Sequence, residues 1–501
     1  MGALGQVLSS WFSVDLPGAP DASKSRLLTL PPELLTGIVQ ELSWQDLLRI
    51  RPTCRLLDEV SKSSPVWRNI ARLELLDDCT TGANELFFDR PVEQYKLGEL
   101  ERLILRWKQA KQNWTADNGI PPAFRTFKIN VERVHLVRGG RWLLFARRTG
   151  SIVYLDLDAS GPPVEHILIP ERTGSSDTTM ALDYIPNSNV LTFNVALAVR
   201  QFPGEREKTG VTYTIQVWRV RLSLRDDGAG LADRLSAGCL VSFCQDPQCF
   251  VYSISILGDY IAHTLLSKGD YKDFSFIVVT KWVDLIDMEG GCNYTKWSHY
   301  SRLKWRSIVY LLPGHQLLVY ADGAIQLYDF FRFPESKALP TRPDRSSWSD
   351  PLWKTFIDGA DLFPAPPMIS GPDFVRMVIF ANTGFRGLTI YSPNRQAERE
   401  SPASICELGE CPGLEPLYPA PSYGHRYSTL MTGSQLTLVS HPWPDGSEGK
   451  FRYLGKITCH KGQGLDRLFD MMSGRIVIVN RTIDILDLAP MNAFGAGQRI
   501  A

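Results

Sequence analysis

The chain has 501 residues, of which 44% are hydrophobic and 22% are charged. This length exceeds that of one ordinary domain, and the composition is that of a globular rather than a disordered protein. Lysine and arginine together number 54, as do aspartate and glutamate. The chain therefore has no global positive field that would hold nucleic acid or an anionic membrane, and we expect neither as a partner.

The nine cysteines are dispersed along the chain, from Cys54 to Cys459. An odd, scattered set is typical of reduced thiols rather than of a disulfide framework. Residues 1–23 contain no lysine or arginine, so a secretory signal there would lack its charged start. The longest apolar run, 190–199, is about half a membrane span. We expect a cytoplasmic or nuclear protein.

The first part of the chain predicts a tail followed by short helices. Residues 1–25 show no periodicity and predict a flexible tail. Pro31 and Pro32 fit only at the start of a helix, and the apolar residues up to Leu42 then recur on one face. Further helices are expected after Ser43, Thr53 and Ser64. Residues 26–78 thus predict a small helical module, whose surface-to-core ratio is poor enough that a partner would stabilise it.

A longer helix is predicted in the linker region 79–119, from Pro91 to about Trp114. Its apolar residues repeat at helical spacing: Leu97, Leu100, Ile104, Trp107 and Trp114. That stripe predicts one face that packs against a neighbouring domain.

Residues 120–490 contain short β-branched and aromatic runs separated by turn residues. One pattern recurs: a turn residue, alternating apolar positions, then a polar residue. It reads GSIVYLDL at Gly150–Leu157, GAIQLYDF at Gly323–Phe330 and TIDILDL at Thr482–Leu488. The pattern ends near 156, 219, 283, 329, 391, 440 and 487, and these spacings suit seven four-stranded units.

These repeats resemble the WD-repeat family of β-propellers. Leu155 and Tyr328 stand where the family has tryptophan; Trp218 keeps the tryptophan, but Arg219 follows it in place of aspartate. The resemblance implies a closed propeller, with a large β-sandwich array as the alternative. Because an open ring leaves edge strands unpaired, we expect residues 124–130 to complete the last blade. Residues 491–501 predict a second flexible tail.

The helical module resembles the F-box. The landmarks follow one another between Leu30 and Trp67: Leu-Pro-x-Glu-Leu-Leu, Asp-Leu-Leu-Arg, Cys-Arg and a final tryptophan. The expected fold class is therefore a multidomain α plus all-β protein, with an F-box bundle and linker helix before the propeller.

The F-box resemblance implies an adaptor function. Members seat an apolar edge on the Skp adaptor, which links them to cullin and RING subunits, while the second domain binds a protein substrate. The residues expected at the adaptor contact are Leu30, Pro31, Leu34, Leu35, Ile38 and Leu48. Two alternatives remain: a scaffold that binds the adaptor without promoting ubiquitination, and a propeller enzyme with a helical oligomerisation domain.

No catalytic, metal or cofactor motif is found in the sequence. It lacks the nucleophile elbow, the zinc-protease helix motif and the phosphate-binding loop. Cys239, Cys244 and Cys249 are five residues apart, wider than the usual zinc knuckle. Asp156 and Asp158 could be paired carboxylates, but the blade-ending position of Asp156 favours a structural role. We expect a non-catalytic protein.

The substrate is not predicted by the sequence. Four arginines beside the first repeat form a candidate site for an acidic or phosphorylated segment, because guanidinium groups match phosphate geometry. They are Arg138, Arg141, Arg147 and Arg148.

Overall fold

The structure is a computed structural model that describes residues 26–489 with interruptions. Outside the described residues lie 1–25, 82–85, 97, 116–122, 490–501 and parts of the interstrand loops, the longest being 202–211, 225–232, 268–274, 287–293, 338–348, 358–368, 411–421, 444–450 and 459–465. Both predicted tails fall there. The chain divides into two compact units. The helical module is Met1–Glu74 with Tyr95–Glu101, and the β domain is Leu75–Gln94 with Arg102–Ala501.

The helices of the module begin and end close to where the sequence predicts them. They are η1 (Arg26–Thr29), α2 (Pro32–Gln40), α3 (Trp44–Ile50), η2 (Arg51–Thr53), α4 (Arg55–Ser61) and α5 (Ser64–Thr81), which continues into the β domain.

Prolines and one serine set these boundaries. Pro31 is the N-cap residue of α2, and Pro32 is its first residue. Ser43 caps α3: its hydroxyl accepts from the Asp46 N–H at 3.2 Å and donates to the Asp46 carboxylate at 2.8 Å. The hydrogen bond from the Ser43 hydroxyl lowers the pKa of Asp46 below its ordinary value, and a weaker contribution in the same direction comes from the hydrogen bond of Arg49. The capping oxygen satisfies an N–H that has no partner within the helix.

Trp67 anchors the core of the module. Its side chain is buried, and its Nε1–H donates to the carbonyl of Ser61 at 2.9 Å. The Arg51 guanidinium lies 5.7 Å from the centre of the Trp67 ring and pairs with Glu101 at 2.5 Å. Leu47 is fully buried in the same module. The final tryptophan of the motif is therefore a packing residue.

The linker helix is shorter at its start than predicted. Residues 92–94 form a 3-10 turn (η3, Val92–Gln94), and α6 begins at Glu99 and ends at Thr115. Gly98 has φ of +81°, a left-handed conformation that cannot continue a helix, and this interrupts the segment that begins at Pro91. Of the predicted stripe, Leu100, Ile104 and Trp107 are buried; Leu97 and the Trp114 side chain lie outside the described residues.

The β domain contains seven antiparallel sheets. Blade 1 is β2 (Arg133–Leu136), β3 (Trp142–Ala146), β4 (Ile152–Asp156) and β5 (His166–Ile169). Blade 2 is β6 (Ser175–Tyr184), β7 (Thr192–Gln201), β8 (Thr212–Ser223) and β9 (Arg234–Cys244). Blade 3 is β10 (Cys249–Leu257), β11 (Tyr260–Ser267), β12 (Ser275–Lys281), β13 (Lys296–Ser301) and a fifth strand, β17 (Glu335–Ser336).

The remaining blades continue in chain order. Blade 4 is β14 (Ile308–Leu312), β15 (Gln316–Ala321), β16 (Ala324–Asp329) and β18 (Trp353–Phe356). Blade 5 is β19 (Ile369–Ser370), β20 (Phe374–Ala381), β21 (Gly384–Tyr391) and β22 (Ala403–Glu410). Blade 6 is β23 (Ser422–Tyr423), β24 (Tyr427–Thr432), β25 (Gln435–Ser440) and β26 (Arg452–Thr458). Blade 7 is β27 (Asp466–Asp470), β28 (Arg475–Val479), β29 (Ile483–Asp487) and β1 (Ala123–Phe127). The short helical turns are η4 (Trp282–Leu285), η5 (Phe330–Arg332) and α7 (Pro393–Gln396).

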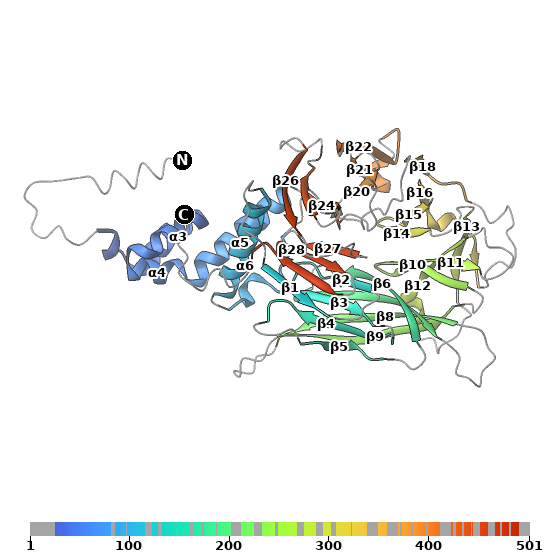
Figure 1. Ribbon diagram of the computed structural model, residues 1–501, viewed down its shortest axis with the longest axis horizontal. Coiled ribbons are helices and arrows are strands. Elements are labelled where there is room, and N and C mark those ends of the chain that lie inside the picture. Colours follow the sequence, from blue (N-terminus) through green and yellow to red (C-terminus); the bar gives the residue numbers. More distant parts are fainter. Residues whose placement is uncertain are drawn as a thin grey trace, which may run out of the picture. The chain divides into compact units, whose positions relative to one another are not determined.

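Each blade packs on the next through its own apolar layer, and the series closes. Separate buried clusters join blades 1 and 2, 2 and 3, 3 and 4, 4 and 5, 5 and 6, 6 and 7, and finally 7 and 1. Figure 1 shows the sheets following one another around the β domain, with the red strands of blade 7 beside the cyan strands of blade 1. The β domain is a seven-bladed β-propeller, which confirms the predicted fold and blade number.

The last blade is completed from the other end of the domain sequence. β1 pairs antiparallel with β29, with Phe124 opposite Leu486 and Phe127 opposite Ile483. This confirms the predicted closure. The seven predicted repeat ends also fall in, or within two residues after, the third strands β4, β8, β12, β16, β21, β25 and β29. The prediction of four strands per blade is wrong for blade 3, because the connection after β16 returns to add β17.

We expect Gly140→Ala to destabilise the β domain more than Gly258→Ala. Both glycines have positive φ, +67° and +54°, so alanine is strained by about 1–2 kcal/mol at either position. At Gly140 an added Cβ would also overlap the Ser473 side chain and lie 2.9 Å from the Asp470 carboxylate, whereas Gly258 has open space. The additional loss should be about 1–3 kcal/mol in urea unfolding. Equal losses would contradict the close approach of blades 1 and 7.

Candidate functional site

Helix α2 carries an exposed apolar ridge, which we define as Leu34 and Ile38. Leu34 is 58% exposed and Ile38 is 39% exposed, although both are aliphatic. Residues four apart lie on the same face of a helix, so these two side chains are neighbours. Leu35 and Val39, at 1% and 2% exposed, form the buried face of the same helix. The helix therefore presents one apolar face to its own core and a second to the outside.

The six predicted adaptor contacts do not lie in one environment. Leu34, Ile38 and Pro31 are exposed, and Leu30 and Leu48 are half-buried. Leu35 is buried and is a core residue, so its expected place on the exposed edge is wrong. The reason is the helical period: Leu35 falls about 100° around the helix from Leu34. The sequence pattern could not say which side of a wide apolar face would turn inward.

A buried ion-pair network fixes α6 to the propeller at the junction of blades 7 and 1. Arg106 of α6 pairs with Asp158 at 2.8 Å and donates to the Ser473 carbonyl at 3.2 Å. Asp158 also pairs with Arg475 at 2.6 Å, and Arg475 pairs with Asp487 at 3.3 Å. Both arginines are only 1% exposed.

The network is arranged around one carboxylate. Burial alone would raise the pKa of Asp158, but the nearby Arg106, Arg475 and Arg141 guanidiniums outweigh it and hold the pKa well below its ordinary value. Nearby, Asn113 of α6 donates from its side-chain amide to the Leu488 carbonyl. The part of α6 from Arg102 onward is therefore a component of the β domain.

A second ion-pair group fixes the segment before α6 to blades 1 and 2. Arg141 pairs with Asp156 at 3.0 Å, with Asp233 at 3.0 Å and with Asp89 at 3.2 Å, while Arg90 pairs with Asp89 and Asp233. Burial would lower the pKa of Arg141, but the hydrogen bonds and charge of Asp156, with the other carboxylates, raise it. Asp156 thus lies in a structural ion pair.

The four candidate arginines do not form one patch. Arg138 and Arg141 precede β3 and Arg147 follows it, so roughly 20 Å of extended strand separates Arg141 from Arg147. Arg141 is engaged by three carboxylates, and Arg147 pairs with Glu165. Arg138 lies over the Tyr184 ring, 5.6 Å from its centre. Arg148 lies outside the described residues. The hypothesis of a phosphate-binding cluster is not supported, because strand β3 separates Arg138 and Arg141 from Arg147, and both Arg141 and Arg147 are already paired with carboxylates.

The described part of the chain contains no group of three or more histidine, cysteine or acidic side chains placed to hold a metal ion. No described helix combines the length and apolar character needed to span a bilayer.

Comparison with solved structures gives distant similarities. The Cps50 (Swd1) β-propeller domain of Myceliophteria thermophila is 13% identical, with a TM-score of 0.43, over 73% of this chain and 99% of that one. A chain of the mitotic checkpoint complex is 9% identical, with a TM-score of 0.41, over 75% and 97%. U3-55K is 12% identical, with a TM-score of 0.39, over 74% and 100%. At these identities the similarity concerns the fold alone.

No protein-family model and no curated protein matches the chain. The F-box resemblance therefore rests on the motif residues themselves, and the seven-bladed propeller rests on the seven sheets and their closure.

We expect Asp158→Asn to destabilise the β domain by about 3–5 kcal/mol near neutral pH, because two buried arginines lose a shared partner. A carboxyl group with a lowered pKa in the folded state stabilises the protein above its unfolded pKa, and this contribution is lost as the pH falls. The difference between wild type and variant should therefore narrow below about pH 4. Urea unfolding across pH measures it.

Asp373→Asn is the matched control, because Asp373 forms an exposed ion pair with Arg395 at 3.3 Å. It should cost less than about 1 kcal/mol. A difference for Asp158→Asn that stays constant down to pH 2 would contradict the ion-pair account.

Proposed function

We propose that this protein is the substrate-recognition subunit of a Skp–cullin–F-box ubiquitin ligase, acting in the cytoplasm or nucleus. The observation that carries the proposal is the apolar ridge of Leu34 and Ile38 on α2, the helix that begins within the F-box-like Leu-Pro-x-Glu-Leu-Leu motif. In this proposal the helical module binds the Skp adaptor, and the propeller binds a protein substrate. The protein itself is non-catalytic.

The ridge suits a protein contact on energetic grounds. Burying one exposed aliphatic side chain contributes roughly 1.5–3 kcal/mol, so Leu34 and Ile38 together could supply several kcal/mol on docking. Exposed Pro31 lies one turn before Leu34 and would extend the contact. Half-buried Leu30 and Leu48 are proposed to line its border.

The core residues of the module are distinct from the residues of the exposed ridge. Leu35, Val39 and Leu47 hold α2 and α3 in place from the inside. The ridge residues are therefore free to be changed without removing core volume. The module's stability and its proposed binding activity are carried by different side chains.

The propeller is proposed to present the substrate. Its blades are joined into a closed ring by apolar layers, and such a ring offers loops on a stable scaffold. Holding a substrate on a domain tethered to the ligase raises the effective concentration of its lysines at the transfer site.

We expect Leu34→Asp with Ile38→Asp to weaken binding of purified Skp adaptor by about 100-fold or more, because two apolar contacts are replaced by charges that must be desolvated. Calorimetric titration measures the affinity. Circular dichroism should show unchanged helix content, since neither side chain is in the core. Leu35→Asp is unsuitable as a test because it would place a charge in that core.

Leu73→Asp is the matched control, because Leu73 is 54% exposed on α5 of the same module but lies outside the motif. It should bind the adaptor as the wild type does. Equal affinity for all three proteins, or no binding by the wild type, would end the adaptor proposal.

A receptor and a scaffold differ in the fate of the bound protein. Proteins captured by the Leu34→Asp/Ile38→Asp variant should accumulate relative to those captured by the wild type, because the variant still binds substrates but cannot deliver them. Unchanged abundance of every captured protein would favour the scaffold.

A further inference from the structure

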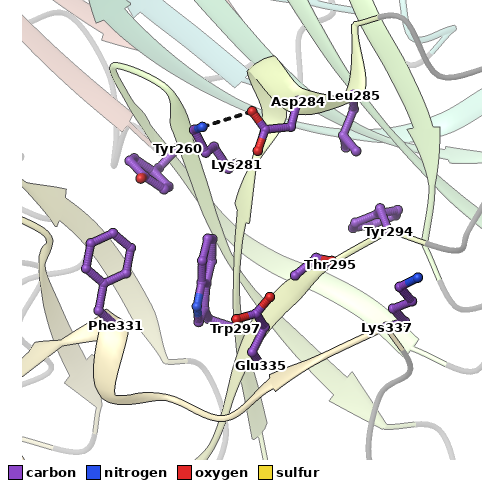
Figure 2. A pocket seen from close by; sticks show the side chains of 10 residues that line it. All are labelled: Tyr260, Lys281, Asp284, Leu285, Tyr294, Thr295, Trp297, Phe331, Glu335 and Lys337. Carbon is purple, nitrogen blue, oxygen red and sulfur yellow. Dashed lines mark ion pairs between the residues drawn. The ribbon is translucent and has the colours of Figure 1, made fainter.

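A pocket of about 510 Å³ lies at one end of blade 3. Its walls come from the start of β11, the end of β12, turn η4, the start of β13 and the returning segment η5–β17. Figure 2 shows Tyr260, Trp297 and Phe331 on one side, Tyr294 and Lys337 on the other, and the Glu335 carboxylate between them. Nothing in the adaptor proposal uses this site.

The pocket forms because the connection after β16 adds a fifth strand, β17, to blade 3. After β16 the chain turns through η5, where the Asp329 carboxylate accepts from the Phe331 N–H at 3.1 Å. It then adds β17 to the edge of β13 and sets Glu335 directly opposite Trp297. In an antiparallel pair such opposite side chains are neighbours on one face of the sheet.

The aromatic rings of Tyr260, Trp297 and Phe331 line one wall of the pocket. They lie close together, and their planes are inclined to one another rather than stacked. Ring centres are 6.0 Å apart for Tyr260 and Trp297, 5.5 Å for Trp297 and Phe331, and 6.1 Å for Tyr260 and Phe331. The planes are inclined by 55–75°. Phe331 is 45% exposed, whereas its neighbour Phe330 is 1% exposed and fills the core. The fold thus requires Phe330 and leaves Phe331 facing outward.

Three polar groups of the aromatic side have no partner among the described residues. Among the residues that the structure describes, the Glu335 carboxylate, the Trp297 Nε1–H and the Tyr260 hydroxyl form no hydrogen bond or ion pair. By contrast, the Asp284 carboxylate is neutralised by Lys281, which lies beside Tyr260, at 2.9 Å (Figure 2). Glu335 is therefore the acidic group available to a ligand on the aromatic side.

The combination matches a cation. The face of an aromatic ring carries negative potential, and indole is the best of the three rings at attracting an ammonium or guanidinium group. An adjacent carboxylate adds a charge-assisted hydrogen bond to the same group. Lys337, across the pocket, suits a carbonyl or carboxylate oxygen of the same ligand.

We propose that this pocket binds a basic side chain, lysine or arginine, of a partner protein, with the cation between Glu335 and the rings of Tyr260, Trp297 and Phe331. A protein side chain fits better than a free small molecule because Phe331, Glu335 and Thr295 are all exposed, so the site is open along one side. Small-molecule sites usually enclose most of the ligand surface.

The test uses the full chain labelled with 5-fluorotryptophan and observed by fluorine NMR, without any adaptor protein. Trp297→Phe identifies the Trp297 signal among those of the thirteen tryptophans. The probes are a short peptide containing one lysine, the same peptide with arginine, the same peptide with neutral norleucine, and free tetramethylammonium. The lysine and arginine peptides should shift the Trp297 signal saturably at millimolar concentration, and the norleucine peptide should not.

Variants then assign the effect to the pocket. Glu335→Gln and Phe331→Ala should each weaken the lysine peptide about two- to fivefold. Phe356→Ala is the matched control, since Phe356 is 66% exposed in blade 4 outside the pocket, and it should leave affinity unchanged. Equal shifts from the norleucine peptide, insensitivity to Glu335→Gln and Phe331→Ala, or tighter binding of tetramethylammonium than of the peptides would overturn the proposal. Adaptor binding is not involved in any of these outcomes.

Discussion

The closure of blade 7 is the interaction on which the rest of the structure depends. β1 supplies the missing edge of β29, and Arg475 of β28 reaches across to blade 1, donating to the Gly140 carbonyl at 2.6 Å and to the Leu157 carbonyl at 3.1 Å. An unclosed ring would expose the backbone edge of β29 and one side of two apolar layers. Arg475 can be buried there because Asp158 and Asp487 neutralise it.

The same junction also holds the part of α6 that belongs to the β domain. Arg106 joins the network through Asp158, and Ala110 packs in the apolar layer between blades 6 and 7. Helix α6 therefore belongs to the helical module at its start and to the β domain from Arg102 onward. The linker helix is thus not a separate element between two domains. Its second half is part of the β domain.

Local features of the sequence predicted most of the fold. Turn residues followed by alternating apolar positions identified the third strand of every blade, and prolines with Ser43 identified the helix starts. Interactions between distant residues were not predictable in this way. Arg106 and Asp158 are 52 positions apart, and Glu335 meets Trp297 only because β17 returns to the preceding blade. The burial of Leu35 beside exposed Leu34 depends likewise on packing that no spacing specifies.

A cross-link between β1 and β29 tests the closed ring most directly. Thr126 and Asp484 are opposite each other in the register, and neither is buried. In the Thr126→Cys/Asp484→Cys variant, mild oxidation should form a disulfide between these two positions, identified by mass spectrometry because the chain has nine cysteines of its own. Absence of that cross-link in the folded protein, with both thiols still free to alkylate, would contradict the closure of the propeller by its first strand.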